Sequence, residues 1–125
     1  VKIKYILIAL GTSIVVHSPR YVYVDVTVQL FPAAEHKASE ELVKEEIYKY
    51  FSEIEKLYGE KLRYNDLFNR IDSLDCVDVV KMLVLDLPKA RVKRDLSGDL
   101  IPNVDQIFLP GKIELQIEHY QVNRR

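Results

Sequence analysis

The chain has 125 residues, of which 48% are hydrophobic and 30% are charged, and its net charge is −1. This length suits one domain with its own core, and this composition is that of a globular chain, which excludes general disorder. Because 18 basic residues nearly balance 19 acidic ones, with both signs interspersed, the charge argues against a surface for nucleic acid or anionic membrane.

Cysteine and histidine are too few and too scattered to indicate metal or redox chemistry. The chain has one cysteine, Cys76, so it forms no internal disulfide, and the apolar neighbours of this thiol favour burial. The three histidines show no spacing that is typical of a metal site. We therefore expect neither a metal nor a cofactor.

The first residues combine a basic start with an apolar run, as signal peptides do. The run over residues 5–10 is shorter than the roughly 20 residues of a membrane span, and Ala9 and Gly11 make a poor cleavage site. We therefore favour a structural segment over a targeting segment. We expect a lead-in at residues 1–11 that continues from missing upstream sequence, one domain at 12–120, and a frayed end at 121–125.

The strongest strand signal covers residues 19–31, where two kinds of side chain alternate. Residues 12–17 form a short β-prone run before it, and Pro19 marks the corner between the two strands. The period of two predicts a long strand of an antiparallel sheet with one face in the core. That face consists of Val22, Val24, Val26, Val28 and Leu30, and the opposite face of Tyr23, Asp25, Thr27, Gln29 and Phe31.

Two amphipathic helices are predicted after this strand. Apolar residues at three- and four-residue intervals predict the first over residues 38–58, with Ser39 as its N-cap and Gly59 as its stop. The second is expected from Asn65, as its N-cap, to about Ser73.

The remaining residues predict two more strands and an irregular hairpin. Residues 77–87 are apolar on both faces, which predicts a central strand, with a bulge near Val79 and Val80. Residues 89–110 are expected to form the hairpin and 113–119 the last strand. The fold class is therefore α+β: a two-layer sandwich with a mainly antiparallel or mixed sheet of about four strands and two helices on one face.

The sequence carries no pattern of a phosphate-binding loop or a nucleophile elbow. Asp72, Asp75 and Asp78 lie between a predicted helix and strand, where carboxylates usually bond to N–H groups of a turn. His17 and His119 fall where one sheet edge could hold both, but they lack a third partner. We therefore expect no catalytic residue.

The aromatic residues of the long strand are candidates for an interface. Tyr21, Tyr23 and Phe31 fall on the face opposite the valines, and aromatic residues on an exposed face are typical of interface cores. The alternative is that they cover an end of the sheet or pack under residues 89–110.

A basic cluster within the predicted hairpin is the second candidate. Arg91, Lys93 and Arg94 follow Lys89, and they suit an acidic partner. Because Asp95 and Asp99 follow at once, we favour a solvated loop or hairpin tip here, and contact with an acidic partner is the alternative.

The order of small motifs along the chain resembles a known family. The motifs are Gly11 and Thr12, the valine-rich run at 14–16, the corner at 19–21 and the alternating strand at 22–30. With the helix at 38–58 and the Leu-Pro-Gly of 109–111, they resemble the baseplate J-like proteins, the wedge components of phage tails and related contractile injection particles. The resemblance covers roughly residues 10–118 and departs from the family at 75–77, where Pro-Gly-Val is commoner.

The resemblance implies the C-terminal region of such a protein. It implies a structural role without catalysis, contacts with other wedge proteins and with copies of itself, and a place in a virion or phage-tail-like particle that is assembled in the cytoplasm. It transfers no residue-level site, because contacts in this family are made by surfaces.

Two other functions stay open on the residues alone. A small ligand-binding or regulatory domain would hold a small molecule in a pocket near Asp25, Tyr23 and His17. An enzyme would depend on aspartate and histidine side chains that the fold brings together.

Overall fold

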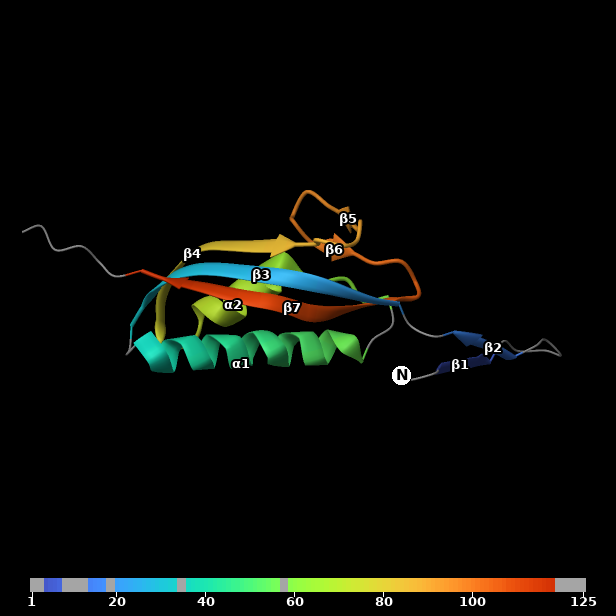
Figure 1. Ribbon diagram of the computed structural model, residues 1–125, viewed down its shortest axis with the longest axis horizontal. Helices are drawn as coiled ribbons and strands as arrows, with labels where there is room; N and C mark the ends of the chain where they lie inside the picture. Colours follow the sequence, from blue (N-terminus) through green and yellow to red (C-terminus); the bar gives the residue numbers. More distant parts are fainter. Residues whose placement is uncertain (1–3, 8–13, 18–19, 34–35, 57–58, 119–125) are drawn as a thin grey trace, which may run out of the picture.

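The computed structural model describes residues 4–7, 14–17, 20–33, 36–56 and 59–118 (Figure 1). Within these ranges the elements are β1 (Lys4–Leu7), β2 (Ile14–His17), β3 (Arg20–Pro32), α1 (His36–Glu55), α2 (Tyr64–Asp72), β4 (Val77–Asp86), β5 (Lys93–Arg94), β6 (Leu100–Ile101) and β7 (Gln106–Ile117). No helix in this part of the chain is long and apolar enough to cross a membrane.

The main sheet has the strand order β4-β3-β7, with β3 in the centre. β3 pairs antiparallel with β4 and parallel with β7, so the sheet is mixed. The pairs β1–β2 and β5–β6 form two small sheets of their own. Both helices lie on one face of the main sheet, with α1 along β7 and α2 along β4 (Figure 1). The predicted α+β fold is confirmed, with three strands in the main sheet where about four were expected.

The core lies between the helices and the predicted apolar face of β3. Val24, Val26, Val28 and Leu30 are fully buried. Apolar side chains of both helices and of β7 pack against them, namely Val43, Ile47, Phe51, Leu67, Ile71 and Phe108. This arrangement follows from the alternation in β3 and the helical period of α1, and among the described residues no helix covers the opposite face of the sheet.

The two predicted N-caps are wrong. α1 begins at His36, so Ser39 lies inside the helix, where its buried hydroxyl donates a 3.1 Å hydrogen bond to the Cys76 carbonyl. α2 begins at Tyr64, and the N-cap position is Arg63, which makes no side-chain cap bond. Gly59 has a φ of +68°, the left-handed geometry that was expected of it. A serine or asparagine beside an apolar run thus marked the neighbourhood of each helix start but not the residue.

β4 is an edge strand, which corrects the predicted central position. Its two apolar faces misled the prediction, because one of them is exposed to solvent. The predicted bulge is confirmed: the register with β3 shifts between Gln29 and Leu30 and again between Phe31 and Pro32, where Lys81 and Asp78 are the extra residues.

The last strand starts seven residues before the predicted position 113, at Gln106, and runs through Pro110 and Gly111. An edge strand tolerates Pro110, which pairs with Val24, because proline lacks only a ladder donor. The register shifts directly afterwards, between Val24 and Val26. The Leu-Pro-Gly run therefore marks a bulge inside β7, whereas the sequence had suggested a strand start.

Candidate interaction surfaces

The outer face of the main sheet, opposite the helices, carries exposed apolar side chains. Val79, Met82 and Val84 of β4 are 45, 42 and 41% exposed, and we call these three residues the outer apolar patch. In the register of the sheet, Phe31 lies opposite Val79 on the same face. Tyr23 of β3 is 56% exposed further along. The sequence had predicted Tyr23 and Phe31 on this face, but it missed the patch because β4 was expected to be central.

A polar group borders the outer apolar patch. The Glu118 carboxylate accepts hydrogen bonds from the Gln29 amide and, at 3.4 Å, from the Lys81 ammonium. The same ammonium lies 6.0 Å from the centre of the Phe31 ring. The Lys81 ammonium therefore lies over the Phe31 ring, and Phe31 is half-buried.

The free edge of β4 is covered by side chains. The Tyr64 hydroxyl donates a 2.8 Å hydrogen bond to the Leu83 carbonyl, and the Arg94 guanidinium donates to the Leu85 carbonyl. Bonds of this kind block the pairing of a further strand. Arg94 is therefore engaged in the fold, while its predicted companions Arg91 and Lys93 are exposed on the segment before and within β5.

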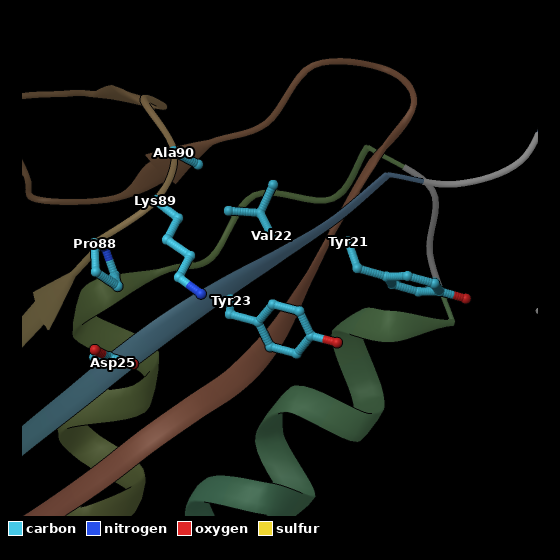
Figure 2. A pocket seen from close by; sticks show the side chains of 7 residues that line it. All are labelled: Tyr21, Val22, Tyr23, Asp25, Pro88, Lys89 and Ala90. Carbon is cyan, nitrogen blue, oxygen red and sulfur yellow. The ribbon is translucent and has the colours of Figure 1, made fainter.

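A pocket of about 390 Å³ lies beside the N-terminal half of β3 (Figure 2). The pocket exists because β4 ends at Asp86, opposite Asp25, whereas β3 continues back to Arg20. Pro88 and the residues after it then leave the line of β4. The lining residues are Tyr21, Val22, Tyr23, Asp25, Pro88, Lys89 and Ala90.

The pocket contains one carboxylate that is already bonded and one cation that is not. The Asp25 carboxylate accepts a 2.8 Å hydrogen bond from the Lys112 backbone N–H. The Lys89 side chain extends from its own segment toward β3 (Figure 2). Within the described residues Lys89 has no ion pair. The sequence had placed a pocket near Asp25, Tyr23 and His17; the structure brings the first two together, and the His17 side chain lies outside the described residues.

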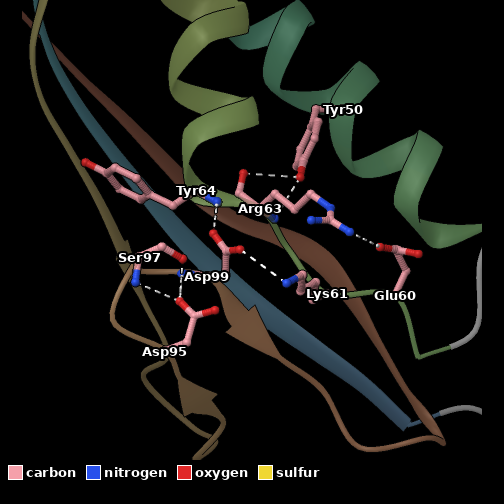
Figure 3. Close-up of polar contacts among 8 residues, drawn as sticks. All are labelled: Tyr50, Glu60, Lys61, Arg63, Tyr64, Asp95, Ser97 and Asp99. Carbon is pink, nitrogen blue, oxygen red and sulfur yellow. Dashed lines mark hydrogen bonds and ion pairs between the residues drawn. The ribbon is translucent and has the colours of Figure 1, made fainter.

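A third group of polar contacts holds the β5–β6 hairpin and the start of α2 together (Figure 3). The Asp99 carboxylate accepts a 2.9 Å hydrogen bond from the Tyr64 N–H and lies 3.6 Å from the Lys61 ammonium. Asp95 accepts bonds from the Ser97 N–H and hydroxyl and from the Asp99 N–H, and the Ser97 hydroxyl lowers the pKa of its carboxyl. These carboxylates satisfy backbone donors, which is a structural role.

The shifted pKa values elsewhere also have structural causes. Burial raises the pKa of the Tyr50 hydroxyl, which donates to the Arg63 carbonyl and accepts from the Arg63 N–H (Figure 3). The hydrogen bond from the Arg70 guanidinium lowers the pKa of Glu53 and raises that of Arg70. None of these groups lines the pocket, so the shifts do not indicate a catalytic centre there.

The other sequence candidates for chemistry are not brought together. Asp72 accepts a 3.2 Å hydrogen bond from the Val80 N–H, as expected of a carboxylate near a turn, and His119 lies outside the described residues. In the described part of the chain, no group of three or more histidine, cysteine or acidic side chains is arranged to hold a metal ion. Cys76 is buried, as its neighbours had suggested.

No family model matches the chain, and no curated protein matches it.

Proposed function

We propose that this chain is a non-catalytic assembly module of a phage-tail-like baseplate, which joins its neighbours through protein surfaces. The observation that supports this most directly is the outer apolar patch, where three apolar side chains of an edge strand stand 41–45% exposed. Removing such a surface from water is favourable. Since neither described helix covers this face of the sheet, the cover would come from another subunit.

The likeness to the baseplate J-like proteins supplies the biological setting. It depends on the order and spacing of glycine, proline and valine motifs over roughly residues 10–118. In this proposal the partners are other wedge proteins and copies of the chain itself, and the location is a virion or a related particle.

Self-association and binding of a baseplate neighbour test the proposal. We expect Met82→Glu to weaken the association about tenfold or more, because it places a charge in the outer apolar patch. Leu42→Glu is the matched control, since Leu42 is 47% exposed on α1, away from the sheet. Sedimentation velocity and pull-down with the neighbouring wedge protein provide the measurement. A wild-type chain that stayed monomeric and bound no neighbour would contradict the proposal.

A small ligand-binding domain is the second candidate, and the pocket of about 390 Å³ favours it. This volume lies within the range of small-molecule sites. A thermal-shift screen with metabolites tests this alternative, and a screen without a hit would count against it.

A further inference from the structure

The N-terminal half of β3 has an open backbone edge. Arg20 donates its N–H to the Asp105 carbonyl beside β7, and the Leu30 carbonyl accepts from the Glu118 N–H on the same side. Backbone groups of successive strand residues point to alternate sides, so the even-numbered residues of β3 face β7. The N–H and C=O groups of Tyr21 and Tyr23 therefore face the other side.

On that side the pairing with β4 stops at Asp25. Within the described residues β4 does not pair with residues 20–24, and outside the strand ladders no backbone hydrogen bond reaches Tyr21 or Tyr23. The pocket occupies this space, between the open edge and the segment of Pro88, Lys89 and Ala90. An extended peptide that enters it would continue the line of β4.

On this side of the sheet, the outer edge of β4 is blocked by side chains, whereas the edge of β3 at residues 20–24 is open. This difference favours strand addition at the pocket. Along β4, the Tyr64 hydroxyl and the Arg94 guanidinium already occupy outward carbonyls. Along residues 20–24 of β3 no side chain does so in the described part of the chain. Unsatisfied backbone groups at an edge are the usual template for an added strand.

The charge around the pocket favours an acidic occupant. Lys89 lines the pocket, and Arg91 and Lys93 are exposed on the segment that follows. Within the described residues none of the three makes an ion pair. The carboxylate that lines the pocket, Asp25, is satisfied by the Lys112 N–H. Arg20 and Asp105 neutralise each other with an Nε–Oδ2 distance of 2.8 Å. The three cations therefore stand against two carboxylates, Asp25 and its register partner Asp86, and the local excess is one positive charge.

We propose that the open edge of β3 binds an acidic, extended peptide of a partner protein as an added antiparallel strand. Its backbone pairs with Tyr21 and Tyr23, and a carboxylate of the peptide contacts the Lys89 ammonium. Its side chains lie alternately beside the two tyrosine rings and beside Val22 and Ala90. A second copy of the chain is the less favourable occupant, because it would bring its own Lys89 and Arg91 toward these cations. This surface is separate from the outer apolar patch.

Three synthetic peptides test the proposal on the intact chain. The first alternates valine and glutamate, the second alternates valine and lysine, and the third has the first sequence with alternate backbone nitrogens methylated. We expect the first to bind about tenfold or more tightly than either of the others by fluorescence anisotropy at low salt. We expect it to slow amide hydrogen exchange at Tyr21 and Tyr23, measured by NMR, because these N–H groups become bonded.

Charge reversal at Lys89 provides the variant. Lys89→Glu should weaken binding of the acidic peptide about tenfold and strengthen binding of the basic peptide, because the charge in the pocket is reversed. Lys89 is exposed, so its replacement leaves the core intact. Lys49→Glu, the same change on the exposed side of α1, should leave both affinities unchanged. Met82→Glu should also leave them unchanged, which separates this proposal from the proposed function.

Three results would overturn the inference. The first is equal binding of the acidic and basic peptides, and the second is exchange protection that appears elsewhere but not at Tyr21 and Tyr23. The third is protection of these two amides in the absence of peptide that increases with protein concentration, which would identify a second copy as the occupant.

Discussion

The Asp25 carboxylate occupies the place that a side chain at Gly111 would need. A Cβ atom added to Gly111 would overlap Oδ1 of Asp25 and lie 3.3 Å from the Val24 carbonyl oxygen. The same Oδ1 accepts the Lys112 N–H at 2.8 Å. The bulge in β7 therefore depends on two features together, the missing side chain at Gly111 and the Asp25 carboxylate that fills its space. They hold the register of β7 against β3, with Asp25 at the pocket.

Gly111→Ala should lower the free energy of unfolding by about 1–3 kcal/mol, because the carboxylate must leave its place. Urea denaturation measures this loss. In an Asp25→Ala background the added methyl group no longer meets Oδ1, so the same substitution should cost less. Strictly additive losses in the double variant would contradict the direct contact.

Tyr50→Phe should lower the free energy of unfolding by about 1 kcal/mol or slightly more, because the Arg63 N–H loses its acceptor, 2.9 Å away. Tyr50 is 5% exposed, so water does not readily replace the hydroxyl. Tyr48→Phe is the matched control, because Tyr48 lies on the same helix and is 51% exposed. An equal loss in both variants would speak against the bond to Arg63.

The same tyrosine predicts a dependence on alkaline pH. Burial raises its pKa above the ordinary value of 10.0 in the folded chain. The folded state therefore keeps the hydroxyl proton after the unfolded state has released it, and the contribution to stability is complete below pH 10 and is lost as the pH rises through the raised pKa. Wild type should lose stability more steeply than Tyr50→Phe above about pH 10 in urea titrations. Parallel profiles would refute this assignment.

Arg70 should link the two helices through ion pairs whose contribution to stability is lost at acid pH. Its guanidinium contacts Glu46 at 3.1 Å and Glu53 at 2.6 Å, both on α1. Arg70 lowers the pKa of Glu53 below the ordinary 4.5, so this contribution is present above pH 4.5 and is lost as the pH falls through the lowered pKa. Arg70→Gln should lower the thermal midpoint by a few degrees at neutral pH and by less in acid. A constant difference across the pH range would exclude the ion pair as the cause.

Asp99→Ala should release the hairpin from the start of α2. The Tyr64 N–H loses its acceptor and Lys61 its counter-ion, at a cost of about 1–2 kcal/mol. Asp99→Asn keeps the acceptor oxygen and should lose less. Hydrogen exchange resolves the site: the amides of Tyr64 and Leu100 should exchange faster in the alanine variant than those in the centre of β3. Uniform acceleration would indicate global destabilisation instead.

The sequence carried the parts of the fold that depend on local periodicity. The alternation from Val22 to Leu30 identified the buried face of β3, and the helical period identified α1 and its packing partners. Such patterns are set by burial, which acts on every second or every third to fourth residue.

The features that could not be predicted from the sequence depend on residues that are distant in the chain. The apolar residues on both faces of β4 predicted a central strand, because the sequence of one strand does not show whether a neighbour pairs with each of its edges. Ser39 bonds to Cys76 and Tyr64 to Asp99, partners 37 and 35 residues away. The pocket arises only because β4 is shorter than β3 at Asp25, and the length of a pairing is a property of two strands together.

The parallel pairing of β3 with β7 has a consequence for how the chain folds. Arg20 and Asp105, at the start of this pairing, are 85 residues apart in the sequence. The pairing closes a long loop, a step that slows folding, whereas β3, the helices and β4 follow one another along the chain. During synthesis the central strand therefore has one unpaired side until β7 emerges, so the β3–β7 half of the sheet is the last part of the fold to form.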